Sequence, residues 1–419
     1  MPVRAEAVID LDAVEANVAL LLAAARSANP RAELMAVVKA DGYGHGAIEV
    51  ANAARRAGAT ALGVATPDEA VALVRAGLES TSDRPVVAWL WVPDQDLRPA
   101  LRAGAQLVVS SSAQLAAVLA ASGADPAGAP QIHLKLDTGL GRGGATMDDF
   151  PAVLREAGSA ERAGGVRVVG LMSHLACADE PGDESVPAQI RAFEKGCAAA
   201  AAAGLTVRWR HLGNTPATLA WPGAVFDLVR CGIGLYGVNP FDSAVPAAAG
   251  LRPAMTLRAG VALTKRVPAG TGVSYGLTYR TAYPTTLALV PVGYADGIPR
   301  TAGPAARVWL RGRQRGIAGR IAMDQFVVDC GDDEVAPGDE VLIFGNGSSG
   351  EPTAADWAAA CGTIGYEIVT RIGPRVPRRY VGFSAAEQAG SAGAGGRQGG
   401  DEMKNASPVD LSASSSEQR

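Results

Sequence analysis

Eight short apolar runs alternate with helical segments between Leu34 and Val229, and this repetition constrains the fold of the chain most strongly. Strands buried on both faces read as continuous apolar runs, as in a parallel sheet. Strand–helix alternation repeated eight times is typical of a TIM barrel. The sequence therefore predicts an α/β fold whose first domain, residues 11–240, is a (β/α)8 barrel. The expected strands are Leu34–Val38, Ala61–Ala65, Val86–Trp91, Leu107–Ser110, Ile132–Leu136, Val166–Leu171, Val207–Leu212 and Val225–Val229, and helices are expected at Leu11–Ser27, Pro67–Ala76, Ala113–Ala121 and Ala188–Ala203.

Beyond Tyr236 the pattern changes to short apolar runs separated by Gly and Pro turns, without long helices. Such spacing predicts a second, all-β domain. The opening strand, Ala5–Asp10, is expected to pair with it, so this C-terminal domain comprises residues 1–10 and 241–383. Residues 384–419 are rich in Gly, Ser, Ala and charge, which predicts a disordered tail.

Composition narrows the class of protein. A net charge of −4 argues against a nucleic-acid-binding protein, which would show a basic surface. No apolar run reaches membrane-spanning length, and the first residues contain no apolar stretch typical of a secretory signal. The five cysteines are scattered and lack Cys-x-x-Cys spacing, so neither a disulfide framework nor a zinc site is indicated. We therefore expect a cytoplasmic protein with reduced thiols, no bound metal and no contact with membranes or nucleic acid.

A single lysine, Lys39, stands where the first apolar run ends, and a Gly/Tyr/His loop from Gly42 to Gly46 follows it. TIM barrels carry their chemistry at the carboxyl ends of the strands. Burial there lowers the pKa of an amine, and a neutral amine can form a Schiff base with a carbonyl compound. A lone lysine at a strand end is more often a side chain that extends its amine to solvent, so Lys39 alone does not decide between the two.

Polar residues also follow the later strands. The fifth run leads through Lys135 to Arg142, the sixth ends at His174, the seventh at Asn214-Thr215, and the eighth leads into Arg230 and Gly232-Ile233. Loops after the last two strands commonly bind phosphate, although small residues there also suit plain turns. One histidine would more often be structural than catalytic. Five polar strand ends at one rim are much harder to explain as structural residues alone, so together they indicate a functional site.

Three further motifs occur in the second domain, around Tyr275, Tyr294 and Met323, and Gly365-Tyr366-Glu367 comes near its end. Each alone is ordinary turn chemistry. In this order and together with the Lys39 stretch, the segments resemble the alanine racemase family from about Val8 to Tyr380. The resemblance implies an isomerase that uses pyridoxal 5′-phosphate (PLP) to interconvert L- and D-alanine and supply D-alanine for peptidoglycan. It also implies a barrel, a β domain, and a homodimer with shared active sites.

The resemblance assigns roles to individual residues. Lys39 would carry PLP and exchange the proton of the D antipode, while Tyr275 from the partner subunit would serve the L antipode. Lys135 matches a lysine that is often carbamylated in the family, and His174 would act as a hydrogen-bonding relay. Met323 would also come from the partner and, with Arg142, contact the substrate. The implied cofactor-binding residues are Lys39, Tyr43, Arg142, His174, Asn214, Thr215, Arg230, Gly232, Ile233 and Tyr366.

Single features of the sequence argue against two other functions and leave a third open. A PLP-dependent decarboxylase of the same architecture would be expected to place an acidic residue where Arg230 stands. A non-catalytic PLP-binding protein of the barrel type would lack the second domain with Tyr275 and Met323. A racemase for serine or lysine stays open, because the sequence does not place the side chains that limit substrate size.

Overall fold

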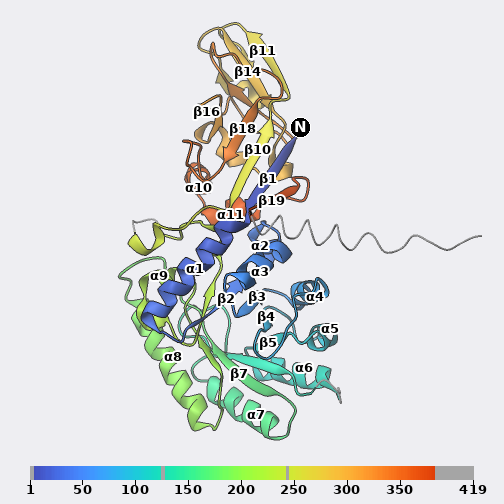
Figure 1. Cartoon of the computed structure of the whole chain (residues 1–419), viewed down its shortest axis with the longest axis vertical. Coiled ribbons are helices and arrows are strands. Elements are labelled where there is room, and N and C mark those ends of the chain that lie inside the picture. The colour runs from blue at the N-terminus through green and yellow to red at the C-terminus, as the bar shows by residue number, and fades with distance from the viewer. Residues whose placement is uncertain (1–3, 124–127, 242–244, 383–419) are drawn as a thin grey trace, which may run out of the picture.

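The structure, a computed structural model, describes residues 4–123, 128–241 and 245–382. A barrel of strands and helices forms one end of the molecule and a β-rich part forms the other (Figure 1). Helix α1 (Leu11–Ala28) runs from the β-rich part along the side of the barrel. The tail expected over residues 384–419 lies outside the described residues.

Eight parallel strands form the barrel, in the order β8-β7-β6-β5-β4-β3-β2-β9. Between β8 and β9 the barrel is closed by backbone hydrogen bonds from Asp227 N to Arg210 O (3.1 Å) and from Arg230 N to Gly213 O (2.8 Å). The predicted barrel is therefore confirmed. Its strands are β2 (Glu33–Val37), β3 (Ala61–Val64), β4 (Val86–Ala88), β5 (Gln106–Val109), β6 (Gln131–Lys135), β7 (Arg167–Met172), β8 (Trp209–His211) and β9 (Leu228–Cys231).

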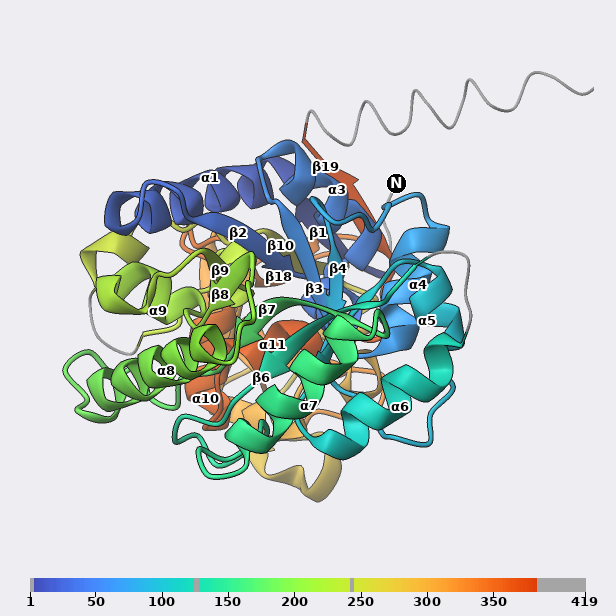
Figure 2. The ribbon, with the colours of Figure 1, turned by 90° about the horizontal axis from the view of Figure 1, so that it is seen from below.

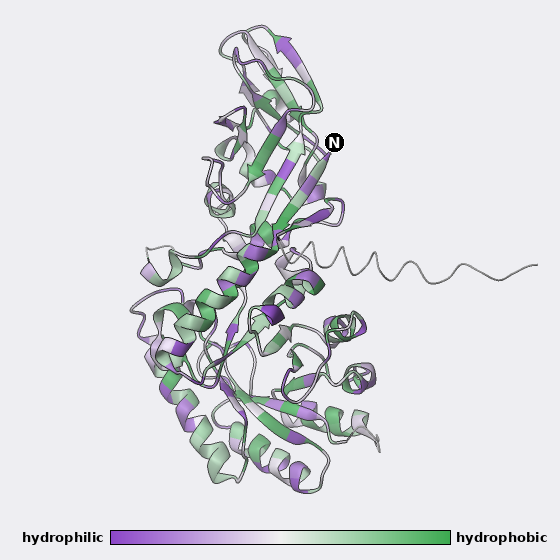
Figure 3. Cartoon of the chain, viewed as in Figure 1, coloured by the Kyte–Doolittle hydropathy of each residue, from purple (hydrophilic) through white to green (hydrophobic). Residues whose placement is uncertain are grey.

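Helices surround this sheet when it is viewed along the barrel (Figure 2). Each carries both hydrophobic and hydrophilic residues, as expected where one face packs on the strands and the other meets water (Figure 3). Helix α4 (Pro67–Arg75) begins with a capping box, in which Thr66 and Glu69 satisfy each other's backbone N–H groups. The remaining helices of the barrel are α3 (Ala47–Arg56), α5 (Arg98–Arg102), α6 (Ser112–Ser122), α7 (Phe150–Arg162), α8 (Ser185–Ala202) and α9 (Thr215–Ala220).

The barrel interior is filled by side chains and is not a pore. Met35, Val87, Val108, Met172 and Trp209 belong to one buried cluster inside it. Trp89, which follows β4, packs on this cluster and also lines the cavity described below. The interior packing thus supplies a rigid floor at the carboxyl ends of the strands.

The β-rich part contains a six-stranded sheet in the order β16-β15-β18-β10-β1-β19. Strand β1 (Ala5–Asp10) pairs antiparallel with β10 and parallel with β19, so the prediction that the opening strand joins this part is confirmed. A three-stranded sheet, β11-β14-β17, and a two-stranded one, β12-β13, complete it. The other strands are β10 (Met255–Gly260), β11 (Leu263–Val267), β12 (Gly272–Val273), β13 (Tyr279–Arg280), β14 (Thr285–Val290), β15 (Arg307–Leu310), β16 (Arg313–Gly316), β17 (Phe326–Asp329), β18 (Glu340–Phe344) and β19 (Arg378–Val381).

Two short helices, α10 (Ala354–Cys361) and α11 (Gly365–Thr370), also lie in this part, which the expected all-β description did not include. Helix α10 forms because Thr353 and Asp356 make a capping box and Trp357 is buried. Helix α11 contacts the short turn α2 (Lys39–Tyr43) at the top of the barrel. The β-rich part therefore reaches the rim where the polar strand ends meet.

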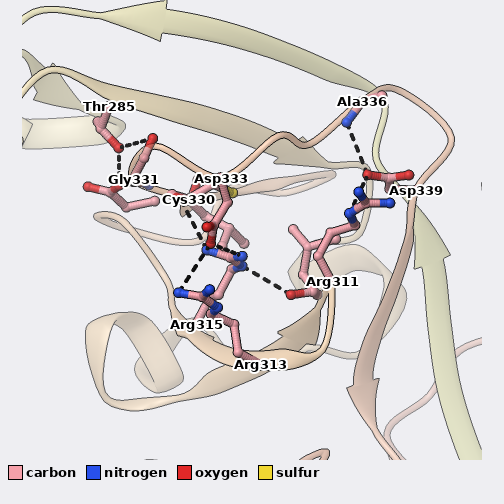
Figure 4. A network of polar contacts seen from close by, with 12 residues as sticks. Thr285, Arg311, Arg313, Arg315, Cys330, Gly331, Asp333, Ala336 and Asp339 are labelled. Atoms are coloured by element: carbon pink, nitrogen blue, oxygen red, sulfur yellow. Dashed lines mark hydrogen bonds and ion pairs between the residues drawn. The ribbon is translucent and has the colours of Figure 1, made fainter.

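Arg315 ties the β15–β16 hairpin to the end of β17 (Figure 4). Its guanidinium is buried and donates to Leu310 O (3.1 Å), to Cys330 O (3.1 Å) and to the Asp333 carboxylate. Arg313, in contrast, is exposed and lies 3.4 Å from the same carboxylate. One buried arginine therefore donates to one carbonyl of the hairpin and to one at the end of β17, so it joins the two segments. Within the described part of the chain, no helix combines the length and apolar character needed to cross a lipid bilayer.

Candidate active site

A cavity of about 590 Å³ opens at the carboxyl ends of the barrel strands and is closed on one side by α11. The structure brings eleven of the predicted residues together around it. They are Lys39, Tyr43, Lys135, Arg142, His174, Asn214, Thr215, Arg230, Gly232, Ile233 and Tyr366. They come from five strand ends and from the β-rich part, so the rim expected from the sequence is a single site.

Tyr275 and Met323 do not line this cavity. Tyr275 is 69% exposed and Met323 is 53% exposed. Tyr275 lies instead at a separate surface groove with Leu263, Leu277 and Phe326. One chain by itself therefore leaves the cavity without the phenol that the sequence analysis assigned as the second acid/base.

A left-handed turn follows Lys39 directly, shortly after β2 ends at Val37. Ala40, Asp41, Gly42 and Tyr43 have φ values of 52°, 52°, 60° and 52°. Each non-glycine residue in this region costs roughly 1–2 kcal/mol. The sequence predicted a loop here but gave no sign of the left-handed run, which local hydrogen bonds must hold in place.

Side chains on both sides of the turn supply those hydrogen bonds. The Asp41 carboxylate accepts from Ala47 N (3.0 Å) at the start of α3. Nδ1 of the fully buried His45 lies 2.9 Å from Tyr43 O, a carbonyl that accepts only, so Nδ1 carries the proton. On the other side, Glu69 accepts from Ala40 N (2.7 Å). The turn is thus fixed at its beginning, middle and end.

Lysine chemistry in the cavity is set by burial and neighbouring cations. Burial, followed by Arg142, lowers the pKa of Lys39, while Glu69 opposes the shift. This agrees with the expected desolvation of an amine at a strand end. Burial together with Arg230 and Arg142 lowers the pKa of Lys135 to about 8. Both amines therefore have a larger neutral fraction near pH 7 than a free lysine.

The loop that brings Arg142 to the cavity is shaped by Asp137. Its Oδ1 accepts from the backbone N–H groups of Gly139 (2.9 Å), Leu140 (3.0 Å) and Gly141 (3.2 Å). Partial burial raises the pKa of the Asp137 carboxyl, but these hydrogen bonds together outweigh it, so the net shift is downward. The sequence placed Arg142 at the site but did not assign this role to Asp137.

Arg230 is buried beneath the cavity and donates to carbonyls from two neighbouring strand ends. Nη1 donates to His211 O (2.6 Å), and Nη2 donates to Ser173 O (2.7 Å) and Leu212 O (3.1 Å). Burial lowers its pKa to about 9, and no carboxylate is among its hydrogen-bond partners in the described chain. The arginine is therefore held rigidly as a donor.

A chain of buried side chains inside the barrel continues from Arg230. His211 Nε2 lies 2.8 Å from His133 Nδ1, and His133 Nε2 lies 2.7 Å from Gln106 Oε1. Sequence reasoning missed these residues. The available signal was the strand alternation, because His133 and His211 occupy inward positions of β6 and β8.

Gln189, on α8, is a second missed residue. It is buried, and its amide nitrogen donates to His174 O (3.2 Å) and Thr138 Oγ1 (3.3 Å). Its oxygen accepts from Ala176 N (3.0 Å). Gln189 thereby holds the segment that carries His174, and no motif around it indicated this from the sequence.

The far end of the cavity suits a phosphate. Thr215 Oγ1 accepts from Gly232 N (3.0 Å), and Asn214 caps α9 by accepting from Ala217 N (3.1 Å). The Tyr43 hydroxyl approaches Gly232 so closely that a Cβ there would lie 2.4 Å from it. Small residues, hydroxyls and backbone N–H groups at one end, with an amine at the other, fit a phosphorylated carbonyl cofactor.

Comparison with known proteins gives one family. Residues 9–240 match the model for the alanine racemase N-terminal domain, and residues 254–380 match that for its C-terminal domain. Curated alanine racemases from Streptomyces coelicolor and Mycobacterium avium are 54% and 47% identical over 381 and 380 residues. These alignments cover 90% of this chain and 96% and 95% of the relatives.

Solved structures agree. The alanine racemase of D-cycloserine-producing Streptomyces lavendulae has a TM-score of 0.85 at 50% identity, covering 91% of this chain and 98% of that one. The Bartonella henselae enzyme, described with covalently bound pyridoxal phosphate, has a TM-score of 0.79 at 26% identity, covering 91% and 100%. The chain therefore belongs to the alanine racemase family, PLP-dependent isomerases that interconvert L-alanine and D-alanine and supply D-alanine for the cell wall.

Proposed function

We propose that Lys39 of one subunit and Tyr275 of a partner subunit exchange protons on opposite faces of the alanine α-carbon. Racemisation requires removal of the proton from one face and its return to the other, so one base is not sufficient. The observation that carries the proposal is the division found in a single chain. Lys39, with its lowered pKa, lines the cavity, whereas the exposed Tyr275 lies outside it.

The cavity supports binding of PLP. Lys39 would hold it covalently, and Tyr43, Asn214, Thr215, Gly232, Ile233 and Tyr366 would bind its phosphate. Arg142 would contact its phenolic oxygen and Arg230 its pyridine nitrogen. When bound, PLP withdraws electrons and makes the α-proton of an attached amino acid acidic. Arg230 donates hydrogen bonds and does not accept the pyridine proton, which favours racemisation over side reactions that need a stronger electron sink.

The chain's own residues then have separate tasks. Lys39 would handle the D antipode and Tyr275 of the partner subunit the L antipode, while His174 connects to Arg230. Arg142 and Met323 of the partner subunit would contact the substrate. A decarboxylase is disfavoured because Arg230, not a carboxylate, occupies the position beneath the cavity.

Lys135 is proposed to carry a carbamate. Its pKa of about 8 leaves a neutral fraction that can add to CO2, forming an N–C bond and releasing one proton. The new anion would lie near Arg142 and Arg230, whose charges act on Lys135. We expect a carbamate carbon signal when the protein is prepared in 13C-labelled bicarbonate, and its loss in Lys135→Gln.

We further propose a homodimer that acts in the cytoplasm on a small amino acid. The exposed groove around Tyr275, with the apolar Leu263 and Leu277, supports a protein contact at this surface. The proposal makes each active site depend on both subunits.

Subunit mixing tests this arrangement. Lys39→Ala and Tyr275→Phe should each be nearly inactive as pure dimers. After the two are mixed, half of the dimers contain one intact site, so activity should recover to about one quarter of wild type. The racemase activity of the mixture is measured by chiral analysis of D- and L-alanine, with serine as the control substrate.

No recovery after verified subunit exchange would contradict a shared site. Borohydride reduction provides an independent check, because it should attach the yellow cofactor permanently to Lys39 in wild type and in Tyr275→Phe. Attachment to any other lysine would refute the assignment of Lys39.

A further inference from the structure

We infer that Glu69, on α4, is a positioning residue for Lys39, because its carboxylate anchors the backbone at Ala40 and places a negative charge near the amine. This inference rests on the role proposed for Lys39 and extends it to a residue outside the cavity. Glu69 does not line the cavity and lies 30 positions beyond Lys39 in the chain.

The two carboxylate oxygens of Glu69 accept hydrogen bonds from two different segments of the chain. Oε2 accepts from Ala65 N (2.8 Å) and Thr66 N (3.1 Å), which completes the capping box of α4. Oε1 points to another strand end and accepts from Ala40 N at 2.7 Å. A capping box requires only the contact of Glu69 with Thr66 N, so the contact with Ala40 is additional to the helix cap.

The position of Ala40 in the chain explains why this contact can affect Lys39. Ala40 is the first residue of the left-handed run and follows Lys39 directly. Strained backbone persists only where its surroundings determine it fully. A hydrogen bond to a charged acceptor at Ala40 N is therefore well placed to set the direction in which the Lys39 side chain leaves the backbone.

Charge gives a second, independent link. The charges of Arg142 and Glu69 both shift the pKa of Lys39. The Lys39 amine also lies 5.9 Å from the centre of the Tyr43 ring. The other charged or titratable residues that line the same cavity are Tyr43, Lys135, Arg142, His174, Arg230, Tyr366, Glu367 and Arg371. Within the described chain, Glu69 raises the proton affinity of Lys39 against burial and Arg142. Loss of this charge should make Lys39 release its proton at lower pH.

The test compares Glu69→Gln with Thr66→Ala in the full-length PLP-bound enzyme. Thr66→Ala removes the other half of the capping box, the acceptor for Glu69 N (3.3 Å), and leaves the contact with Ala40 intact. Both variants should unfold at a lower temperature. Only Glu69→Gln should move the acidic limb of the kcat profile for D-alanine to lower pH, by roughly half a pH unit or more. The profile of kcat is the one to measure, because it reports the substrate-bound enzyme, in which the Lys39 amine is no longer attached to the cofactor. Glu69→Gln should also alter the visible circular dichroism of the cofactor, which reports the geometry at Lys39.

Glu69→Asp covers the case in which Glu69→Gln does not fold. It keeps the charge but shortens the reach, so the circular dichroism band should change while the pH profile stays near that of wild type. The inference is wrong if Glu69→Gln and Thr66→Ala agree in both profile and band, or if Glu69→Gln matches wild type. Borohydride labelling of wild-type Lys39 separates the two proposals. If Lys39 is not labelled, the proposed function is rejected. If Lys39 is labelled and the Glu69 variants behave like their controls, only the role of Glu69 is rejected.

Discussion

Arg230 Nη2 donates a hydrogen bond of 3.0 Å to Nδ1 of His174. A guanidinium has donors only, so His174 accepts at Nδ1 and, when neutral, carries its proton on Nε2. Burial, followed by the charge of Arg230, lowers the pKa of His174 well below its usual value. His174 is therefore neutral at physiological pH, and only its Nε2 side remains for a relay toward other groups.

Replacement of Arg230 by Lys should destabilise the barrel strongly. A lysine ammonium lacks the fork that reaches His211 O, Ser173 O and Leu212 O together, and unsatisfied buried carbonyls are costly. We expect Arg230→Lys to reduce the free energy of unfolding by about 2–4 kcal/mol. Urea denaturation measures this. The control is Arg210→Lys, an exposed ion pair with Asp227, which should change stability by about 1 kcal/mol or less.

Acidification should destabilise the protein through its histidines. All four histidines have lowered pKa values because they are buried, with His45 at about 4 and His133 at about 3. The unfolded chain binds protons near pH 6.5 while the folded chain does not, so stability is fully present above that pH and is lost as pH falls. Each histidine contributes a slope approaching 1.4 kcal/mol per pH unit, roughly, below pH 6.5.

Urea denaturation between pH 7.5 and pH 5 checks this slope. His45→Asn keeps a donor near Tyr43 O but removes one titrating group, so its slope should be smaller by about 1.4 kcal/mol per pH unit. A stability that is flat across this range would show that the histidines titrate at ordinary values.

Gly232→Ala should weaken PLP binding through a contact with Tyr43. Gly232 has a negative φ of −115°, so no left-handed backbone requires glycine here, but the new Cβ would lie 2.4 Å from the Tyr43 hydroxyl. Displacement of that hydroxyl from the phosphate end should raise the Kd for PLP by about 10-fold or more. Titration of PLP followed by absorbance measures it. The effect should be non-additive with Tyr43→Phe, and simple additivity would place the cause elsewhere.

Arg315 and Arg313, two of the arginines labelled in Figure 4, form a matched pair for stability. The Arg315 side chain is 5% exposed and satisfies two backbone carbonyls, so Arg315→Lys should cost about 2–3 kcal/mol. Arg313 shares the same carboxylate but is 64% exposed, so Arg313→Lys should cost about 0–1 kcal/mol. Thermal and urea unfolding of both variants, with PLP bound, decides whether burial and not charge pairing is the cause. Equal losses would contradict this explanation.

Strand alternation was sufficient to predict where the catalytic rim lies. Lys39, His174, Asn214 and Arg230 follow apolar runs and Lys135 lies at the end of one, and parallel strands in a barrel end on the same side. The roles of individual residues came from the resemblance to a family, and they stay predictions for this chain. The division into domains at residues 240 and 383 also stays a prediction.

By itself, the sequence determined the order of strands and helices, because periodicity is a property of neighbouring residues. It also determined which polar side chains reach the rim. Only the tertiary structure decided the left-handed turn after Lys39, the reach of Glu69 to Ala40 and the buried path from Arg230 through His211 to His133. These contacts join segments far apart in the chain, and they form only when the closed barrel fixes the register of its strands and excludes water from between them.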